Sequence, residues 1–222
     1  MKNKLASIII KILSTKLVKL LLIVLLLFLF SSAIGKSIIH NSNDFRNLIK
    51  YARNVNSLYD FFNNPIFWNL SVGITLKILI DILLGSLLLY TVVKAVDFTL
   101  TFSKSIKIIA LAQFVFLFQF WTEFAVLKNS HLSNNVVLLQ EFSLFSVDSF
   151  LNSLGINYSM NFKYAFQILN IFEILYSIFL SIILKVVFKI SIKRAIVITF
   201  LCYILPLLIW LLFISSITFL YN

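Results

Sequence analysis

The sequence predicts an all-α fold, a polytopic membrane helical bundle with five transmembrane helices and one amphipathic interfacial helix, built as a single integral membrane domain over residues 1–222. Of these residues, 61% are hydrophobic and 12% are charged, whereas soluble domains average about 45 to 50% and about 25%. The mean hydropathy is +1.02. Apolar runs of about 20 residues, long enough to cross a hydrocarbon core roughly 30 Å thick, alternate with basic or polar segments.

The first predicted span covers residues 19–39 and follows a segment rich in lysine. At 3.6 residues per turn, Lys4, Lys11 and Lys19 lie close to one helical face. This segment is therefore expected to anchor the span in the cytoplasm, with specific binding to anionic lipids of the inner leaflet as the alternative. A basic start, an apolar core and small residues near its end also fit a signal peptide. The apolar run continues to Ile39, which favours an uncleaved span.

The middle of the chain predicts two more spans, residues 68–93 and 106–127. Before them, residues 43–62 place apolar side chains at steps of three and four, the spacing of an amphipathic helix. We expect that helix to lie flat on the outer face of the membrane or to pack over the bundle. Residues 128–159, of moderate polarity, are predicted to form an outer loop, and their apolar stretch from Val136 to Phe150 is expected to touch the membrane or cap the bundle.

The last two spans, residues 160–184 and 195–220, enclose a short basic connector. Such a pair predicts a membrane hairpin whose turn faces the cytoplasm, because basic loops remain on that side. In the fifth span Pro206 lacks the backbone N–H that an α-helix needs, so a kink is predicted near mid-depth.

The net charge of +11 gathers at predicted membrane edges. Most of the 19 basic residues fall in segments assigned to one side, which places the N-terminus in the cytoplasm and, after five spans, the C-terminus outside the cell membrane. Charges placed in this way predict the lipid bilayer, with anionic lipids at the inner face, and other membrane proteins as partners, rather than nucleic acid. The cytoplasmic basic residues of the last connector are Lys185, Lys189, Lys193 and Arg194.

The predicted spans contain several polar side chains that need partners. Gln113 and Gln119 of the third span are expected to form hydrogen bonds with neighbouring helices. Lys77 and Asp81 of the second span and Glu173 of the fourth carry charges, and an ionisable group near the bilayer centre costs at least about 2.5 kcal/mol. Each charged group should therefore face the bundle interior and have a partner.

The three charged groups are predicted to lie within roughly 3 Å of one depth, at about 1.5 Å of rise per residue. They would form a buried polar cluster, supported by Asn170 and Gln167. Two carboxylates and one ammonium leave one negative charge, so a carboxyl must be protonated or a cation must join. Structural pairing is the favoured interpretation, and a proton or ion relay is the alternative.

The sequence lacks the residue patterns that phosphate binding, nucleophilic catalysis or metal binding would need. The sequence contains no glycine-rich phosphate loop, and no nucleophile with an adjacent base can be assembled, so neither a catalytic residue nor a cofactor is predicted. His40 and His131 fit no metal-binding motif, which predicts no metal site, although a shared metal between them is conceivable. Cys202 is the single cysteine, so an intramolecular disulfide is excluded.

Four segments resemble the Yip family of polytopic membrane proteins (Ypt-interacting proteins), in its bacterial-type branch. They are Leu154-Gly-Ile-Asn157, Asn170-Ile-Phe-Glu-Ile174, Lys189-Ile-Ser-Ile-Lys-Arg-Ala195 and, more loosely, Asn64-Pro-Ile-Phe-Trp68. The resemblance implies a non-enzymatic five-span bundle. Its eukaryotic members contact small GTPases, but the Tyr-Gly and Asp-Leu-Tyr signatures of those members are missing here, so that role is not implied.

The function expected from these features is that of a scaffold or accessory subunit of a membrane assembly, with no enzymatic activity and no identified small-molecule substrate. The alternative is a proton- or ion-coupled transport component that uses the buried polar cluster. A more distant third option is an intramembrane enzyme or a lipid-modifying factor. Stable association with a partner, ion dependence and a lipid product would separate the three.

Overall fold

The computed structural model describes residues 2–40, 73–129, 145–156, 158 and 160–221, and in these ranges the chain is helical with no β-strand. The predicted all-α class is confirmed for this part of the chain. The amphipathic helix predicted at 43–62 and much of the predicted outer loop lie outside the described residues.

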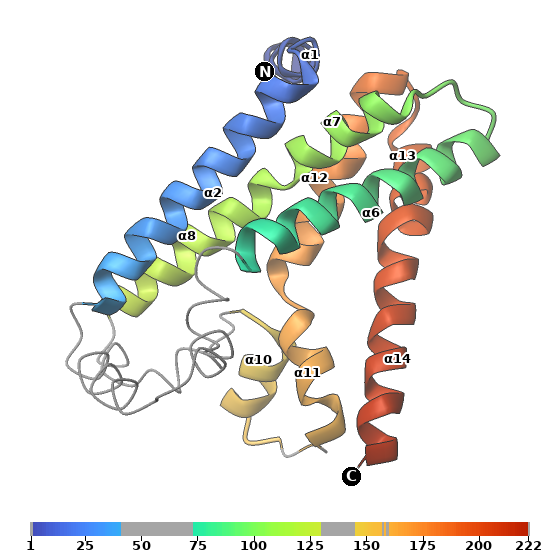
Figure 1. Cartoon of the computed structure of the whole chain (residues 1–222). Helices are drawn as coiled ribbons and strands as arrows, with labels where there is room; N and C mark the ends of the chain where they lie inside the picture. Colours follow the sequence, from blue (N-terminus) through green and yellow to red (C-terminus); the bar gives the residue numbers. More distant parts are fainter. Residues whose placement is uncertain (1, 41–72, 130–144, 157, 159, 222) are drawn as a thin grey trace, which may run out of the picture. The chain divides into compact units, whose positions relative to one another are not determined.

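The described helices follow one another as shown in Figure 1. Four helical stretches are long and apolar enough to cross a membrane, and α1 with α2 would make a fifth if that bent pair forms one span. The stretches are Leu76–Ala95, Phe102–Thr122, Ile171–Phe188 and Ile192–Phe213. The helices are α1 (Lys2–Leu13), α2 (Leu17–His40), α6 (Gly73–Ala95), α7 (Phe102–Ala112), α8 (Phe114–Asn129), α10 (Val147–Ser153), α11 (Met160–Ile168), α12 (Ile171–Phe188), α13 (Ile192–Thr199), the π-helix η3 (Phe200–Ile204) and α14 (Leu205–Tyr221).

The chain forms two compact units. The first contains Met1–Leu21, Ile82–Phe116 and Ser143–Asn222, and the second contains Leu22–Asp81 and Leu117–Phe142. In the second unit, apolar residues of α2 and of the first turns of α6 are buried, namely Val24, Phe28 and Ile78.

Helix α12 is the centre of the first unit, because α1, α7 and α13 all pack against it. One of its faces is buried along its whole length, through Phe172, Tyr176, Leu180, Ile183 and Leu184. On the same face the Ser181 hydroxyl lies 2.9 Å from the Thr199 hydroxyl of α13, in a buried hydrogen bond. This bond fixes the register of α12 against α13, since a polar group in an apolar interior needs a partner.

The predicted fourth span, residues 160–184, is two helices rather than one. α11 ends at Ile168, and α12 begins at Ile171, after a break at Leu169 and Asn170. The Asn170 amide oxygen accepts the backbone N–H groups of Phe172 at 2.8 Å and Glu173 at 3.1 Å. Asparagine is a strong helix start because its side chain replaces the missing backbone partners, and the apolar pattern of this region does not reveal that break.

The predicted kink at Pro206 corresponds to a π-helix. Residues Phe200–Ile204 form η3, which ends two residues before the proline, and the backbone N–H of Leu205 bonds to the Phe200 carbonyl, five residues back. A proline ring clashes with the carbonyl four residues before it, and a widened turn is one way in which helices absorb that clash.

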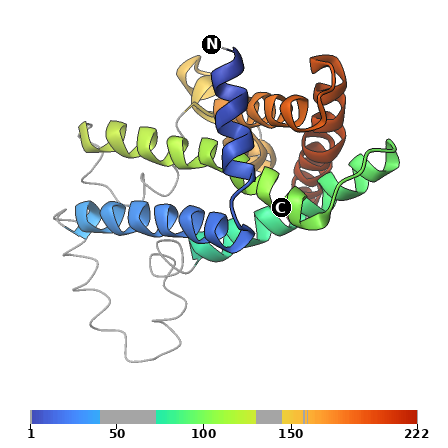
Figure 2. The same ribbon diagram turned by 90° about the horizontal axis from the view of Figure 1, so that it is seen from above.

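The N-terminal segment forms a separate helix, α1, bent by 106° from α2. Ile9 of α1 is buried, whereas Lys4 and Lys11 are exposed, and α1 packs against both α7 and α12. Figure 2 shows the bend between α1 and the first turn of α2. The charged face predicted from the lysine spacing thus points away from the core.

A lysine of α7 holds the end of α1. The Lys107 ammonium lies 3.1 Å from the Leu13 carbonyl and 2.5 Å from the Thr15 carbonyl. The last carbonyls of a helix have no partner within the helix and carry a partial negative charge, so a cation there supplies both a donor and a favourable charge.

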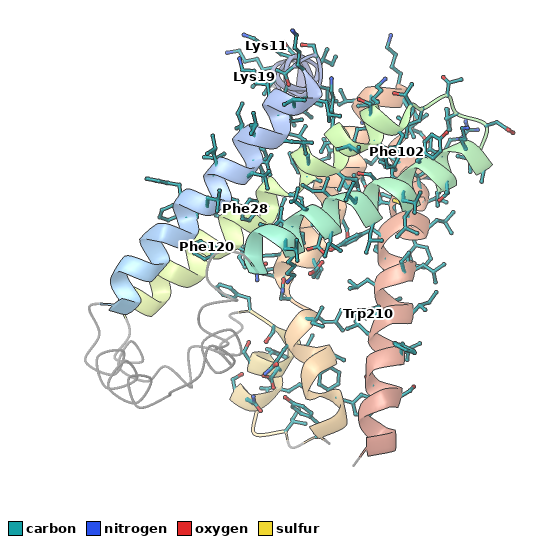
Figure 3. All side chains as sticks on the ribbon, in the orientation of Figure 1. Lys11, Lys19, Phe28, Phe102, Phe120 and Trp210 are labelled. Atoms are coloured by element: carbon teal, nitrogen blue, oxygen red, sulfur yellow. The ribbon has the colours of Figure 1, made fainter. Side chains whose placement is uncertain are left out.

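The basic segments of the first unit meet at one end. The Lys107 contact joins the N-terminal segment to α7, and the rings of Phe98 and Phe188, 5.5 Å apart, join the α6–α7 turn to the end of α12. Lys11 and Lys19 lie at this end in Figure 3. The end is strongly positive and is called the basic end below.

Replacement of Lys107 by methionine should loosen α1, because methionine keeps the length of the side chain but donates no hydrogen bond. Hydrogen bonds to charged groups contribute about 1.5 to 3 kcal/mol, so amide hydrogen exchange in α1 should speed up by about tenfold or more. Lys104→Met is the matched control, since Lys104 is exposed on the same helix. Equal exchange rates in both variants would contradict this role of Lys107.

Candidate functional site

The candidate site lies where α12 begins. Asn170 caps this helix, and its side-chain N–H donates to the Ile168 carbonyl at 3.1 Å. The chain around Asn170 is also paired antiparallel with the chain around Ser146. In that pairing the N–H of Val147 donates to the Leu169 carbonyl at 2.8 Å. The break before α12 is therefore stabilised both by the Asn170 side chain and by the segment around Ser146.

Glu173 projects from the first turn of α12 and meets the π-helix. The hydroxyl of Tyr203, in η3, donates a hydrogen bond to the Glu173 carboxylate. The position of Glu173 in the first turn is favourable for an anion, since the N-terminus of a helix carries a partial positive charge. Glu173 thus lies three residues into its helix, whereas a continuous fourth span would place it much deeper.

Aromatic rings enclose this contact. The ring of Tyr203 packs on Tyr176, with centroids 4.3 Å apart, and Tyr176 stacks on Phe116 at 5.0 Å. Tyr176 is fully buried in α12. The part-buried carboxylate–hydroxyl pair therefore sits beside an aromatic stack that joins α12, η3 and the start of α8.

Gln167 takes part in a second polar contact, with Asp148 of α10. The buried Asp148 carboxylate accepts the Gln167 side chain of α11 at 3.3 Å and the Asn152 side chain at 3.0 Å. This contact ties α10 to α11. Of the residues expected to support Glu173, Asn170 is thus bonded to the Glu173 backbone, and Gln167 is bonded to Asp148.

The other two members of the predicted cluster lie on α6. Lys77 and Asp81 are one turn apart on the same side of this helix, and both are exposed. That they meet Glu173 stays a prediction.

The remaining predicted residues are placed as follows. Gln113 is buried at the break between α7 and α8, and Gln119 is half-buried on α8. The four basic residues of the last connector, Lys185, Lys189, Lys193 and Arg194, are exposed at the basic end. No group of three or more metal-binding side chains occurs among the described residues, which exclude His131 and the side chain of His40.

The sequence does not predict the roles of three residues that form these contacts. Asp148 fell in a predicted loop, and its partner is 19 positions away. Tyr203 looked like one aromatic among many, although its position three residues before Pro206 places it in a turn that a proline disturbs. Lys107 was counted only as a basic charge, whereas its bonds reach back more than 90 positions. Contacts over such separations leave no local pattern.

The chain matches no family model, no curated protein and no solved structure at a significant level. The resemblance to the Yip family therefore stays a prediction.

Loss of the Tyr203 hydroxyl should destabilise the protein, since Tyr203→Phe removes one hydrogen bond to Glu173 and keeps the ring. We expect a loss of about 1 to 3 kcal/mol in the free energy of unfolding, measured in lipid–detergent micelles. Tyr90→Phe is the control, because the ring of Tyr90 also packs on an aromatic ring, edge to face on Phe102 with centroids 5.9 Å apart. A double-mutant cycle with Glu173→Gln should give a coupling energy of about 1 kcal/mol, and a value near zero would contradict the contact.

Proposed function

We propose that this chain is a multi-pass, non-enzymatic membrane protein that acts as a scaffold or accessory subunit of a membrane assembly. The proposal rests on one observation: the rest of the protein buries only a small part of each apolar helix. Between 22% and 39% of the residues in the four candidate spans are buried inside the protein. The rest of each helix needs lipid or another protein against it.

The polar contacts support a structural use. Among the described residues, every buried side-chain nitrogen and oxygen has a hydrogen-bond partner. Several of these bonds join one helix to another, as in the Ser181–Thr199, Tyr203–Glu173 and Gln167–Asp148 contacts. A helix bundle held by such bonds presents fixed outer faces, which is what a scaffold requires.

The proposal includes an orientation in the cell membrane. The basic end would face the cytoplasm, with anionic lipids of the inner leaflet beside its lysines, and the C-terminus would lie outside. Other membrane proteins are the partners that a scaffold would hold, and the Yip-like segments favour this role.

Purification from native membranes in mild detergent tests the scaffold function. A defined partner should be recovered in constant ratio with the wild type and with Glu173→Gln alike, because the partner would contact the outer faces of the helices. Lys104→Met serves as a control for non-specific charge effects. Recovery of the chain without any stoichiometric partner would contradict a scaffold.

A second candidate function is proton or ion coupling, built on Lys77, Asp81 and Glu173. One observation favours it, namely that a carboxylate and a tyrosine meet at a π-helix, a form of backbone found frequently at functional sites. In proteoliposomes, ion or proton flux through the wild type should then disappear in Glu173→Gln. Equal flux in both would exclude coupling through this carboxylate.

A further inference from the structure

The short helix α10 has its charged residue inside and its largest apolar residues outside, the reverse of a surface helix in water. The Asp148 carboxylate is 6% exposed and accepts hydrogen bonds from Gln167 and Asn152, on the side that packs on α11 (Figure 1). Phe150 and Leu154, one turn apart on the opposite side, are 62% and 57% exposed. In water, burial of a carboxylate and exposure of large apolar side chains are both unfavourable.

The two remaining sides of α10 also differ from each other. Val147 and Leu151 lie on one of them and are half-buried, whereas Ser149 and Ser153 lie on the other and are exposed. Each of these serine hydroxyls donates to the backbone carbonyl three residues before it, at 2.8 and 2.7 Å. Helix α10 thus has a protein side, an apolar side opposite to it, and a polar side between them. A helix that lies in a membrane surface at the rim of a bundle needs these sides.

The position of α10 along α12 agrees with a membrane boundary. Helix α12 has 18 residues, which at 1.5 Å of rise per residue give a length of about 27 Å. This length is close to a hydrocarbon core of about 30 Å. With the basic end at one boundary, the start of α12 reaches the other boundary. The pairing of Ser146 with Asn170 keeps α10 beside that start.

We infer that α10 is an interfacial helix whose Phe150 and Leu154 side chains enter the acyl chains of the outer leaflet. Ser149 and Ser153 then face the headgroups and water, and Asp148 stays against the protein. The sequence left two roles open for the apolar stretch that ends at Phe150, namely contact with the membrane and capping of the bundle. The outward direction of Phe150 and Leu154 favours the first role.

Acyl chains fit the apolar side of α10 better than another protein does. Protein interfaces combine apolar contacts with hydrogen bonds. The hydroxyls of Ser149 and Ser153 and the side-chain amide of Asn152 already donate within this unit. Asp148 is the single charged residue from Phe145 to Ile156, and it is buried. Helix α10 therefore offers a protein neither a charge nor a free hydroxyl donor, and acyl chains require neither.

The interfacial helix rests on the proposed membrane insertion and orientation, and it names the outer leaflet as the contact of α10. It also connects lipid to the break before α12, because α10 is bonded to Gln167 and paired with Asn170. The two proposals fail separately. A chain that alkaline carbonate extracts from membranes overturns the insertion, whereas an inserted chain whose α10 contacts only water overturns only the interfacial helix.

Fluorescence quenching of a bimane label tests α10 in the full chain, reconstituted in lipid nanodiscs. In a Cys202→Ala background, Phe150→Cys and Leu154→Cys label the apolar side, and Ser149→Cys and Ser153→Cys are the matched controls, exposed and adjacent in sequence. An interfacial helix inserts its apolar face about 5 to 10 Å. Lipids brominated on their acyl chains should therefore quench the apolar-side labels at least about twofold more than the control labels. Iodide in the buffer should give the reverse order.

The quenching order decides the outcome. Bromine quenching that does not distinguish the two sides, or iodide quenching that is equal at all four positions, would overturn the interfacial helix. Labels at positions 150 and 154 that neither quencher reaches would also overturn it, since another protein would then cover this side. If Phe150→Cys fails to fold, the comparison of Leu154→Cys with Ser153→Cys decides alone.

Discussion

The requirement that every polar group find a partner where water is absent governs this structure. In a bilayer interior the backbone satisfies itself only within helices or closed barrels, and the described chain, which is helical, meets that condition. Wherever a helix starts, stops or widens, a specific group compensates: Asn170 at the start of α12, Lys107 at the end of α1, and the shifted bond of Leu205 at the π-helix.

Because of the same requirement, polar side chains form hydrogen bonds that connect one helix to another. Ser181 and Thr199 connect α12 to α13, Tyr203 and Glu173 connect the π-helix to α12, and both bonds lie along one helix. One face of α12 is buried by α1, α7 and α13. The two hydrogen bonds therefore fix α13 and the π-helix in register with α12. The basic end closes this unit on one side, where Lys107 of α7 bonds to the end of α1 and the α6–α7 turn packs on the end of α12.

The sequence predicts the class well, because apolar length and composition act over whole segments, and four or five of the predicted spans have helices that fit. It predicts local interruptions poorly. The break at Asn170 lies in an apolar run and depends on one amide, and the π-helix depends on Pro206 together with its neighbours. The partners of Glu173 and Gln167 lie 30 and 19 residues away, and hydropathy carries no information on pairs of that kind.

In the proposed orientation α12 crosses the membrane, with the basic end in the cytoplasm and α10 outside. Single cysteines at Ser153 and Lys193, both exposed, test it directly in a Cys202→Ala background with a maleimide that cannot cross membranes. The account predicts that Ser153→Cys reacts in intact cells, whereas Lys193→Cys reacts only after permeabilisation. Reaction of both positions from the same side would contradict a transmembrane α12.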